Sequence, residues 1–102
     1  MKNLSQEEWS TQSSSSKNSV IIDVRTPQEW SEGIIPGAVK LNIMDTDHFI
    51  EELKKLDNQK EYFVYCRSGA RSGKACEMMD DLGFKSASNL VGGILEWSGE
   101  IE

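Results

Sequence analysis

A cysteine with two arginines in the next five positions is the segment of this 102-residue chain best suited to chemistry. A free thiol with a pKa of about 8.5 is only about 3% ionised at pH 7. Backbone amides of a glycine-containing loop and two permanent cations would favour the thiolate, since one pKa unit requires only about 1.4 kcal/mol. We therefore interpret Cys66 as a candidate nucleophile. The residues after it form a candidate loop for an anionic substrate: Arg67, Ser68, Gly69, Ala70 and Arg71.

The elements on either side would place this loop at the edge of a sheet. Residues 62–65 form an apolar and aromatic run that predicts a strand ending directly before Cys66. Apolar residues at helical spacing predict a helix over about 70–82, with Gly83 as its stop. In α/β proteins, sites form where strands end and helix N-termini begin, and those termini carry positive potential.

The rest of the chain predicts the same class of fold. A β-branched run over 20–24 indicates a strand buried on both faces, and Thr26 and Pro27 begin a short helix after it. Strands alternating with helices indicate an α/β domain with parallel strands, occupying 1–102 without a boundary. The further elements that we expect are helices over 6–12 and 47–56, short strands over 38–41 and 87–90, a loop over 13–16 and a last short helix after 91–93.

Several other residues have a structural rather than a chemical interpretation. Cys76 lies on the apolar face of its helix, so we expect a core residue rather than a second catalytic thiol. Asp23 and Arg25 lie at the end of a strand and could act as acid and base, but a structural ion pair near the site is favoured. His48 is expected to be solvated or to cap a helix. Two cysteines and one histidine match no metal-binding spacing, so no metal is expected.

Composition excludes several classes of partner. The net charge of −6 argues against nucleic acid, and no apolar run is long enough to cross a membrane. The first residues lack an apolar segment, so we expect no secretory signal and a cytoplasmic protein. Within residues 62–76, however, Arg67, Arg71 and Lys74 occur with no acidic residue. An acidic body with one cationic loop suits a site for a small anion.

Motifs along nearly the whole chain resemble rhodanese-type sulfurtransferases. The loop over 66–71 resembles their active-site loop, and four further motifs occur in the family's order. They are Ile22-Asp23-Val24-Arg25, Pro27-x-Glu29-Trp30, Gly33-x-Ile35-Pro36-Gly37-Ala38 and Asn89-Leu90-x-Gly92-Gly93-x3-Trp97. The family usually has a histidine in place of Ile34. The absence of this histidine does not change the activity that the resemblance implies.

The resemblance implies a rhodanese-like fold, with a small, mostly parallel sheet of about five strands flanked by helices on both faces. It also implies that Cys66 takes a sulfane sulfur from thiosulfate or another persulfide donor and forms a persulfide. The outer sulfur then passes to a thiol, to cyanide or to a protein cysteine, and no cofactor is implied. By this analogy Arg67 and Arg71 attract the anionic donor.

Two alternatives remain. The spacing from Cys66 to Arg71 is C-x4-R, whereas related phosphatases and arsenate reductases have a C-x5-R loop, which disfavours those activities. A binding or sensor module, or a persulfide carrier with little turnover, would use the same fold. Because inactive members typically lose the cysteine, the retained Cys66 favours an enzyme.

Overall fold

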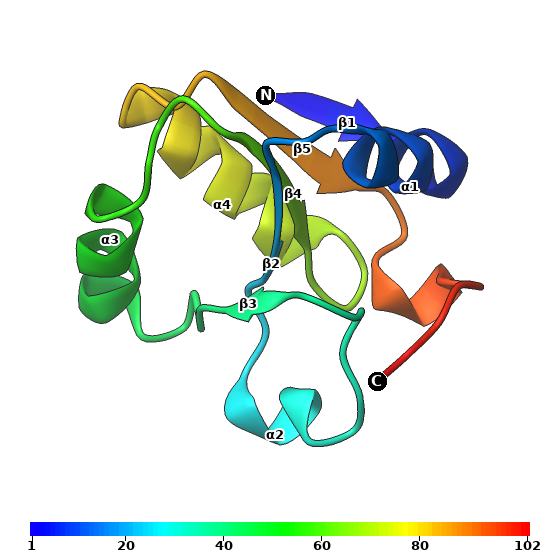
Figure 1. Ribbon diagram of the computed structural model, residues 1–102. Coiled ribbons are helices and arrows are strands. Elements are labelled where there is room, and N and C mark those ends of the chain that lie inside the picture. Colours follow the sequence, from blue (N-terminus) through cyan, green and yellow to red (C-terminus); the bar gives the residue numbers. More distant parts are fainter.

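A computed structural model describes every residue from Met1 to Glu102 and contains one five-stranded sheet (Figure 1). All neighbouring strands are parallel, and their order across the sheet is β1-β5-β4-β2-β3. The strands are β1 (Lys2–Leu4), β2 (Ser19–Asp23), β3 (Val39–Lys40), β4 (Glu61–Tyr65) and β5 (Ser86–Leu90).

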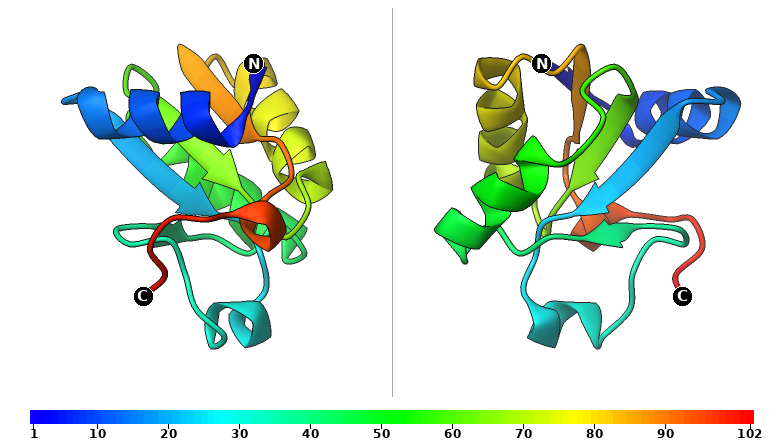
Figure 2. Two further views of the ribbon diagram at one scale, coloured as in Figure 1. Left: turned by 90° about the vertical axis from the view of Figure 1, so that its right-hand side faces the viewer. Right: turned by 60° about the vertical axis from the view of Figure 1, so that its left-hand side comes forward.

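Helices cover both faces of this sheet. Figure 2 shows α1 on one face, with α3 and α4 on the opposite face. The helices are α1 (Gln6–Ser15), α2 (Pro27–Trp30), α3 (Thr46–Lys54) and α4 (Ala70–Asp81), followed by a short 3-10 helix over Ile94–Glu96. The predicted α/β class with a parallel sheet and helices on both faces is thereby confirmed.

Each face of the sheet has its own apolar core. Under α1, Trp9 is fully buried and packs edge-on against Phe63 and Tyr65 of β4. The larger core lies under α3 and α4, and Cys66 and Cys76 both belong to it. β4 is therefore buried on both sides, which explains its nearly continuous apolar sequence.

Side-chain caps fix the starts of two helices. Ser5 and Glu8 form a capping box at the start of α1, in which the Ser5 hydroxyl accepts from the Glu8 amide. Thr26 and Glu29 form the same arrangement at α2, with Pro27 in the first turn. The predicted beginnings of both helices are confirmed, because these signals are local in sequence.

Three local predictions differ from the structure. Residues Ser13 to Ser15 continue α1 instead of forming a loop, because the ordered first turns extend the helix across a polar stretch. β1 was not expected, since a three-residue edge strand has too short a pattern to be recognised. Leu82 is exposed and lies just beyond α4, so it does not join the helix's buried face.

No helix in the structure combines the length and the apolar character that a membrane span requires.

Candidate active site

Cys66 lies directly after β4 and four residues before α4, at the carboxyl edge of the sheet (Figure 1). Its side chain is fully buried, whereas Arg67, Ser68 and Ala70 beside it are exposed. The chain therefore folds over the sulfur as a short loop.

Hydrogen-bonding groups from the loop and from the first turn of α4 surround the sulfur. The Gly69 amide donates to Cys66 Sγ at 3.1 Å, and Ser72 Oγ lies 3.3 Å from the same atom. Gly69 can direct its amide inward because its φ is 107°, a conformation that favours glycine. It also immediately precedes α4, whose first turn adds positive potential.

These groups change the acidity of Cys66. Burial raises the pKa of the thiol and is the largest single effect. Hydrogen bonds from the Ser72 hydroxyl and from the amides of Ser72, Gly69 and Ser68 lower it, and together they outweigh burial. The pKa of Cys66 is therefore below its ordinary value, as a nucleophile at neutral pH requires.

The second cysteine has the opposite properties. Cys76 is fully buried within α4, and burial raises its pKa to about 12. It stays protonated at neutral pH, in agreement with the core role predicted for it. No three His, Cys, Asp or Glu side chains gather closely enough to hold a metal ion.

The segment after β5 holds the beginning of the loop in place. The amides of Ile94 and Leu95 donate to the carbonyl oxygens of Cys66 and Arg67, both at 3.0 Å. A Cβ on Gly93 would lie 2.3 Å from Arg67 O and 2.7 Å from Cys66 O. The glycine at position 93 is therefore required by close backbone approach to the loop.

Asp23 and Arg25 form a buried ion pair beside the site. Arg25 Nη2 donates to Asp23 Oδ2 at 2.7 Å and to the carbonyl oxygen of Gly33 at 2.7 Å. Asp23 is aligned with Tyr65, the last residue of β4, so the pair lies next to the strand that ends at Cys66. The pair therefore links the end of β2 to the segment around Gly33.

Arg71, the second arginine of the predicted substrate-binding loop, is paired with a carboxylate. Its guanidinium donates to both carboxylate oxygens of Glu29, at 2.7 and 2.8 Å. Hydrogen bonds from Arg71, together with the Thr26 cap, lower the pKa of Glu29 to about 2, although burial opposes this. Glu29 therefore stays ionised and neutralises Arg71, tying α2 to the first turn of α4.

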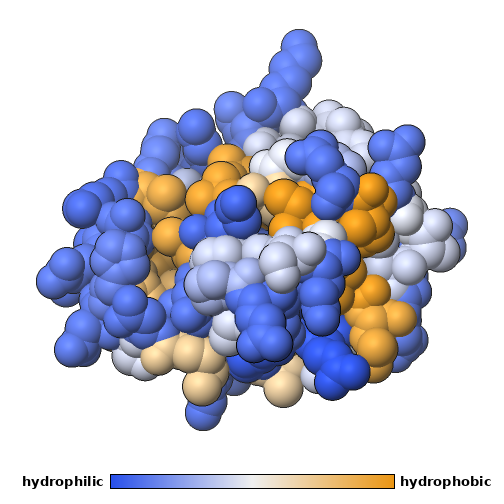
Figure 3. All heavy atoms as spheres, turned by 90° about the horizontal axis from the view of Figure 1, so that it is seen from below, coloured by the Kyte–Doolittle hydropathy of each residue, from blue (hydrophilic) through white to orange (hydrophobic).

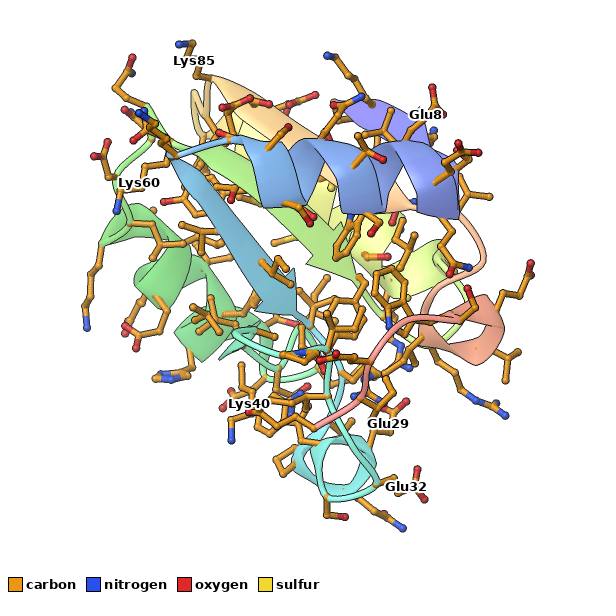
Figure 4. All side chains as sticks on the ribbon, turned by 45° about the vertical axis from the view of Figure 1, so that its right-hand side comes forward. Glu8, Glu29, Glu32, Lys40, Lys60 and Lys85 are labelled. Carbon is orange, nitrogen blue, oxygen red and sulfur yellow. The ribbon has the colours of Figure 1, made fainter.

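Of the two loop arginines, Arg67 is the one whose positive charge is not paired with a carboxylate. It forms no ion pair and lines a cavity of about 700 Å³ beside the loop. Glu29 of α2 and Glu32, just after this helix, also line the cavity, and Figure 4 shows both at the lower end of the molecule. The remaining lining residues are Arg25, Gly33, Ile94, Leu95 and Ile101.

Sequence reasoning did not assign a role to three residues of this arrangement. Ser72 and Asn89 are buried and hydrogen-bonded to each other at 2.5 Å, and Glu29 pairs with Arg71. Asn89 and Glu29 occur in motifs of the resemblance, so they could have been marked as candidates. Ser72 lies on the α4 face that bears Cys76 and Met79, where a lone serine among apolar residues was the available signal.

Comparison with known proteins agrees with this geometry. A sequence profile described as "Rhodanese-like domain" matches residues 6–100. "Putative sulfurtransferase YtwF" of Bacillus subtilis is 44% identical over 80 residues, covering 78% of this chain and 74% of that protein. A "Sulfurtransferase" of Allochromatium vinosum is 36% identical, covering 78% of this chain and 71% of that protein.

A solved structure matches the whole chain. The crystal structure of a "Rhodanese-like Domain Protein" from Staphylococcus aureus superposes with a TM-score of 0.84 at 33% identity. It covers 100% of this chain and 97% of the other. From the length of the profile match and the identity to these relatives, the chain belongs to the rhodanese-like domain family.

Proposed function

We propose that this protein is a sulfurtransferase that moves a sulfane sulfur through a persulfide on Cys66. The observation that carries the proposal is the Cys66 sulfur held by the Gly69 amide beneath a loop that lowers its pKa. The sulfurtransferase names of the two relatives support the same reaction class.

The first half-reaction loads the cysteine. The Cys66 thiolate attacks the outer sulfur of thiosulfate, a new S–S bond forms, and the bond within thiosulfate breaks. Sulfite leaves with the electron pair of that bond, so the total charge of −3 is conserved between reactants and products. Amides directed at the sulfur stabilise the negative charge that passes to the outer sulfur of the persulfide.

The second half-reaction regenerates the enzyme. A nucleophilic acceptor, such as cyanide, a thiolate or a protein cysteine, attacks the outer sulfur of the persulfide. The S–S bond to Cys66 breaks and returns its electron pair to the cysteine, which becomes a thiolate again. With cyanide the product is thiocyanate, and neither half-reaction changes the total number of electrons.

Arg67 is the proposed binding group for anionic donors. It is the loop arginine without an acidic partner, and it lines the cavity next to Cys66. Since the Cys66 side chain has no exposed surface, the exposed loop residues must move aside when a donor reaches the sulfur. Ser68 and Ala70, exposed and tied by no side-chain hydrogen bond, are the residues that we expect to move.

The alternative activities predict different outcomes when the protein is exposed to a sulfur donor. Phosphatase activity remains disfavoured by the four residues between Cys66 and Arg71. A binding module without sulfur transfer would leave Cys66 unmodified after exposure to a donor. A carrier with little turnover would form the persulfide but release it slowly.

Mass spectrometry after incubation with thiosulfate tests the proposal. We expect the peptide that contains Cys66 to gain ~32 Da, the mass of one sulfur, because the lowered thiol pKa supplies a nucleophile at pH 7. Cyanide should remove this mass and release thiocyanate. An unmodified Cys66 peptide, or a phosphatase turnover exceeding sulfur transfer, would contradict the proposal.

Two cysteine variants complete the experiment. Cys66→Ala should abolish both persulfide and thiocyanate formation. Cys76→Ala should retain most of the activity, because Cys76 is a protonated core residue. Equal losses in the two variants would show that the effect of Cys66→Ala is not specific to the nucleophile.

A further inference from the structure

Asn89, in β5, is buried and its side-chain amide has three hydrogen-bonding neighbours. Its Nδ2 donates to the carbonyl oxygen of Gly69 at 3.1 Å and to Asn3 Oδ1 at 3.0 Å. Its Oδ1 lies 2.5 Å from Ser72 Oγ. A carbonyl oxygen can only accept, so rotating the amide by half a turn would place two acceptors against each other at Gly69. The orientation of Asn89 is therefore determined by Gly69.

This orientation determines where the proton of Ser72 lies. Asn89 Oδ1 has no hydrogen, so the short contact to Ser72 requires the hydroxyl to donate. A serine hydroxyl has one proton and two lone pairs. The lone pairs are then available to the other neighbour of Ser72 Oγ, which is Cys66 Sγ at 3.3 Å.

The two protonation states of Cys66 use this hydroxyl differently. A neutral thiol can donate its S–H proton to Ser72 Oγ while Ser72 donates to Asn89. A thiolate needs a donor, and Ser72 can become one only by turning its proton away from Asn89. That rotation leaves two oxygen atoms 2.5 Å apart with no hydrogen between them.

We propose that Asn89 is a positioning residue that competes with Cys66 for the single proton of Ser72, and so raises the pH at which Cys66 ionises. The inference rests on Cys66 being the nucleophile of the proposed function. Asn89 reaches the sulfur only through Ser72, and the backbone amides, among them that of Gly69, support the thiolate without this competition.

The other groups that influence Cys66 lie on α4 and at the end of β2. Arg71 and Cys76 of α4 are both electrostatically coupled to the Cys66 sulfur. Asp23, paired with Arg25, lies at the end of the neighbouring strand. None of these groups contacts Asn89 through a hydrogen bond, so a substitution at position 89 leaves their charges in place.

Titration of the thiolate by its ultraviolet absorbance tests the proposal. The titration uses Cys76→Ala as the parent, in which Cys66 is the one remaining thiol. Both tyrosines have raised pKa values, chiefly through burial, so they do not interfere near neutral pH. Asn89→Leu should lower the Cys66 midpoint by about one pH unit, the size expected of one hydrogen bond to a charged group.

A second substitution separates competition from a general disturbance. Ser72→Ala should raise the midpoint less when Asn89 is present than when it is absent, because Asn89 competes for the hydroxyl proton whose hydrogen bond to the sulfur lowers the Cys66 pKa. In the Asn89→Leu background, the same change should raise the midpoint by about one pH unit, because there the hydroxyl supports the thiolate. A merely structural effect of position 89 would not produce this dependence on Ser72.

The proposal is overturned if Asn89→Leu leaves the midpoint unchanged or raises it, or if Ser72→Ala has the same effect in both backgrounds. Circular dichroism of each variant establishes that it is folded. If the leucine variant does not fold, Asn89→Ala replaces it with the same expected direction. The titration involves no sulfur donor, so its result is independent of whether Cys66 forms a persulfide.

Discussion

The groups around the Cys66 sulfur are hydrogen-bond donors without formal charge. Of the two loop arginines, Arg71 is bound to the carboxylate of Glu29. The amides of Gly69, Ser68 and Ser72 and the Ser72 hydroxyl lower the thiol pKa. Arg71 is coupled to the sulfur, but its charge is balanced by Glu29. The lowered pKa of Cys66 therefore depends on the Ser72 hydroxyl and on backbone amides rather than on the charges of the two loop arginines.

A charge-neutral variant of Glu29 tests the contribution of its pair with Arg71. Glutamine retains the capping box at α2, since Gln also serves at that position, but loses the negative charge. We expect Glu29→Gln to lower the free energy of unfolding at pH 7 by about 1 to 2 kcal/mol. Urea unfolding measures this difference.

The same pair predicts a pH dependence with a definite sign. Glu29 has its pKa lowered from 4.5 to about 2 in the folded protein, so its stabilisation is complete above pH 4.5. This stabilisation is lost as the pH falls towards 2. The difference in the free energy of unfolding between wild type and Glu29→Gln should therefore become smaller over that interval. Glu32→Gln is the control, because it removes a carboxylate of the same cavity that has no ion pair and should leave the free energy of unfolding at pH 7 unchanged. A constant difference across this range would contradict the assignment.

At the scale of elements, the active-site loop depends on segments far from it in sequence. β4 ends at the loop, α4 begins after Gly69, and the segment after β5 donates two amides to the loop's first carbonyls. Gly93 thus has a positioning role that a turn signal alone does not reveal.

Gly93→Ala tests this role. The added Cβ would meet Arg67 O at 2.3 Å, so the backbone of the loop or of the 3-10 helix must shift. We expect persulfide formation to fall at least about tenfold, because small displacements of reacting groups are costly. The rate of appearance of the persulfide mass measures the effect.

Gly83→Ala is the matched control for backbone strain. Gly83 also has a positive φ, of 87°, but a Cβ there would meet nothing within 4 Å. Its alanine variant should lose about 1 kcal/mol of stability through strain and form the persulfide at the normal rate. Equal losses of rate in both variants would show that strain alone, rather than contact with the loop, explains the result.

Over the whole molecule, the distribution of charge differs from the pattern along the sequence. Residues 62–76 carry only positive charges, yet the folded site includes Glu29 and Glu32 near Arg67 and Arg71. Figure 3 shows the end of the molecule below the sheet as mostly hydrophilic, with separate apolar patches between the polar side chains. Arg67 is therefore the one unpaired loop cation that this acidic protein offers to the anionic donor that we propose.

Two variants with the same change in net charge test this conclusion. Arg67→Gln should raise the KM for thiosulfate about tenfold, equal to roughly 1.4 kcal/mol of binding. Lys85→Gln removes one positive charge at the end of the molecule opposite Glu29 and Glu32, as Figure 4 shows. It should leave the KM unchanged, because salt screens the interaction between charges over that distance. Similar increases in the KM of both variants would indicate that the net charge of the protein, rather than a local contact with Arg67, determines the binding of thiosulfate.

The sequence alone determined the features whose causes are local. The β-branched run of β2, the capping residues at Ser5 and Thr26, and the strand–loop–helix around Cys66 each depend on neighbouring residues. The parallel sheet, the position of Cys66 at the end of β4 and the burial of Cys76 could be predicted from such signals. β1 could not, because its pairing with β5 depends on a strand more than eighty residues away.

Only the tertiary structure decided which side chains meet at the site. Arg71 lies 42 residues from Glu29, and Ser72 lies 17 residues from Asn89. These contacts form because the sheet order places β2 and β5 on either side of β4, which brings their following segments to the same edge. Residue types and spacing indicate which groups could act, but the partner of each charge and proton depends on distances that only the assembled sheet sets.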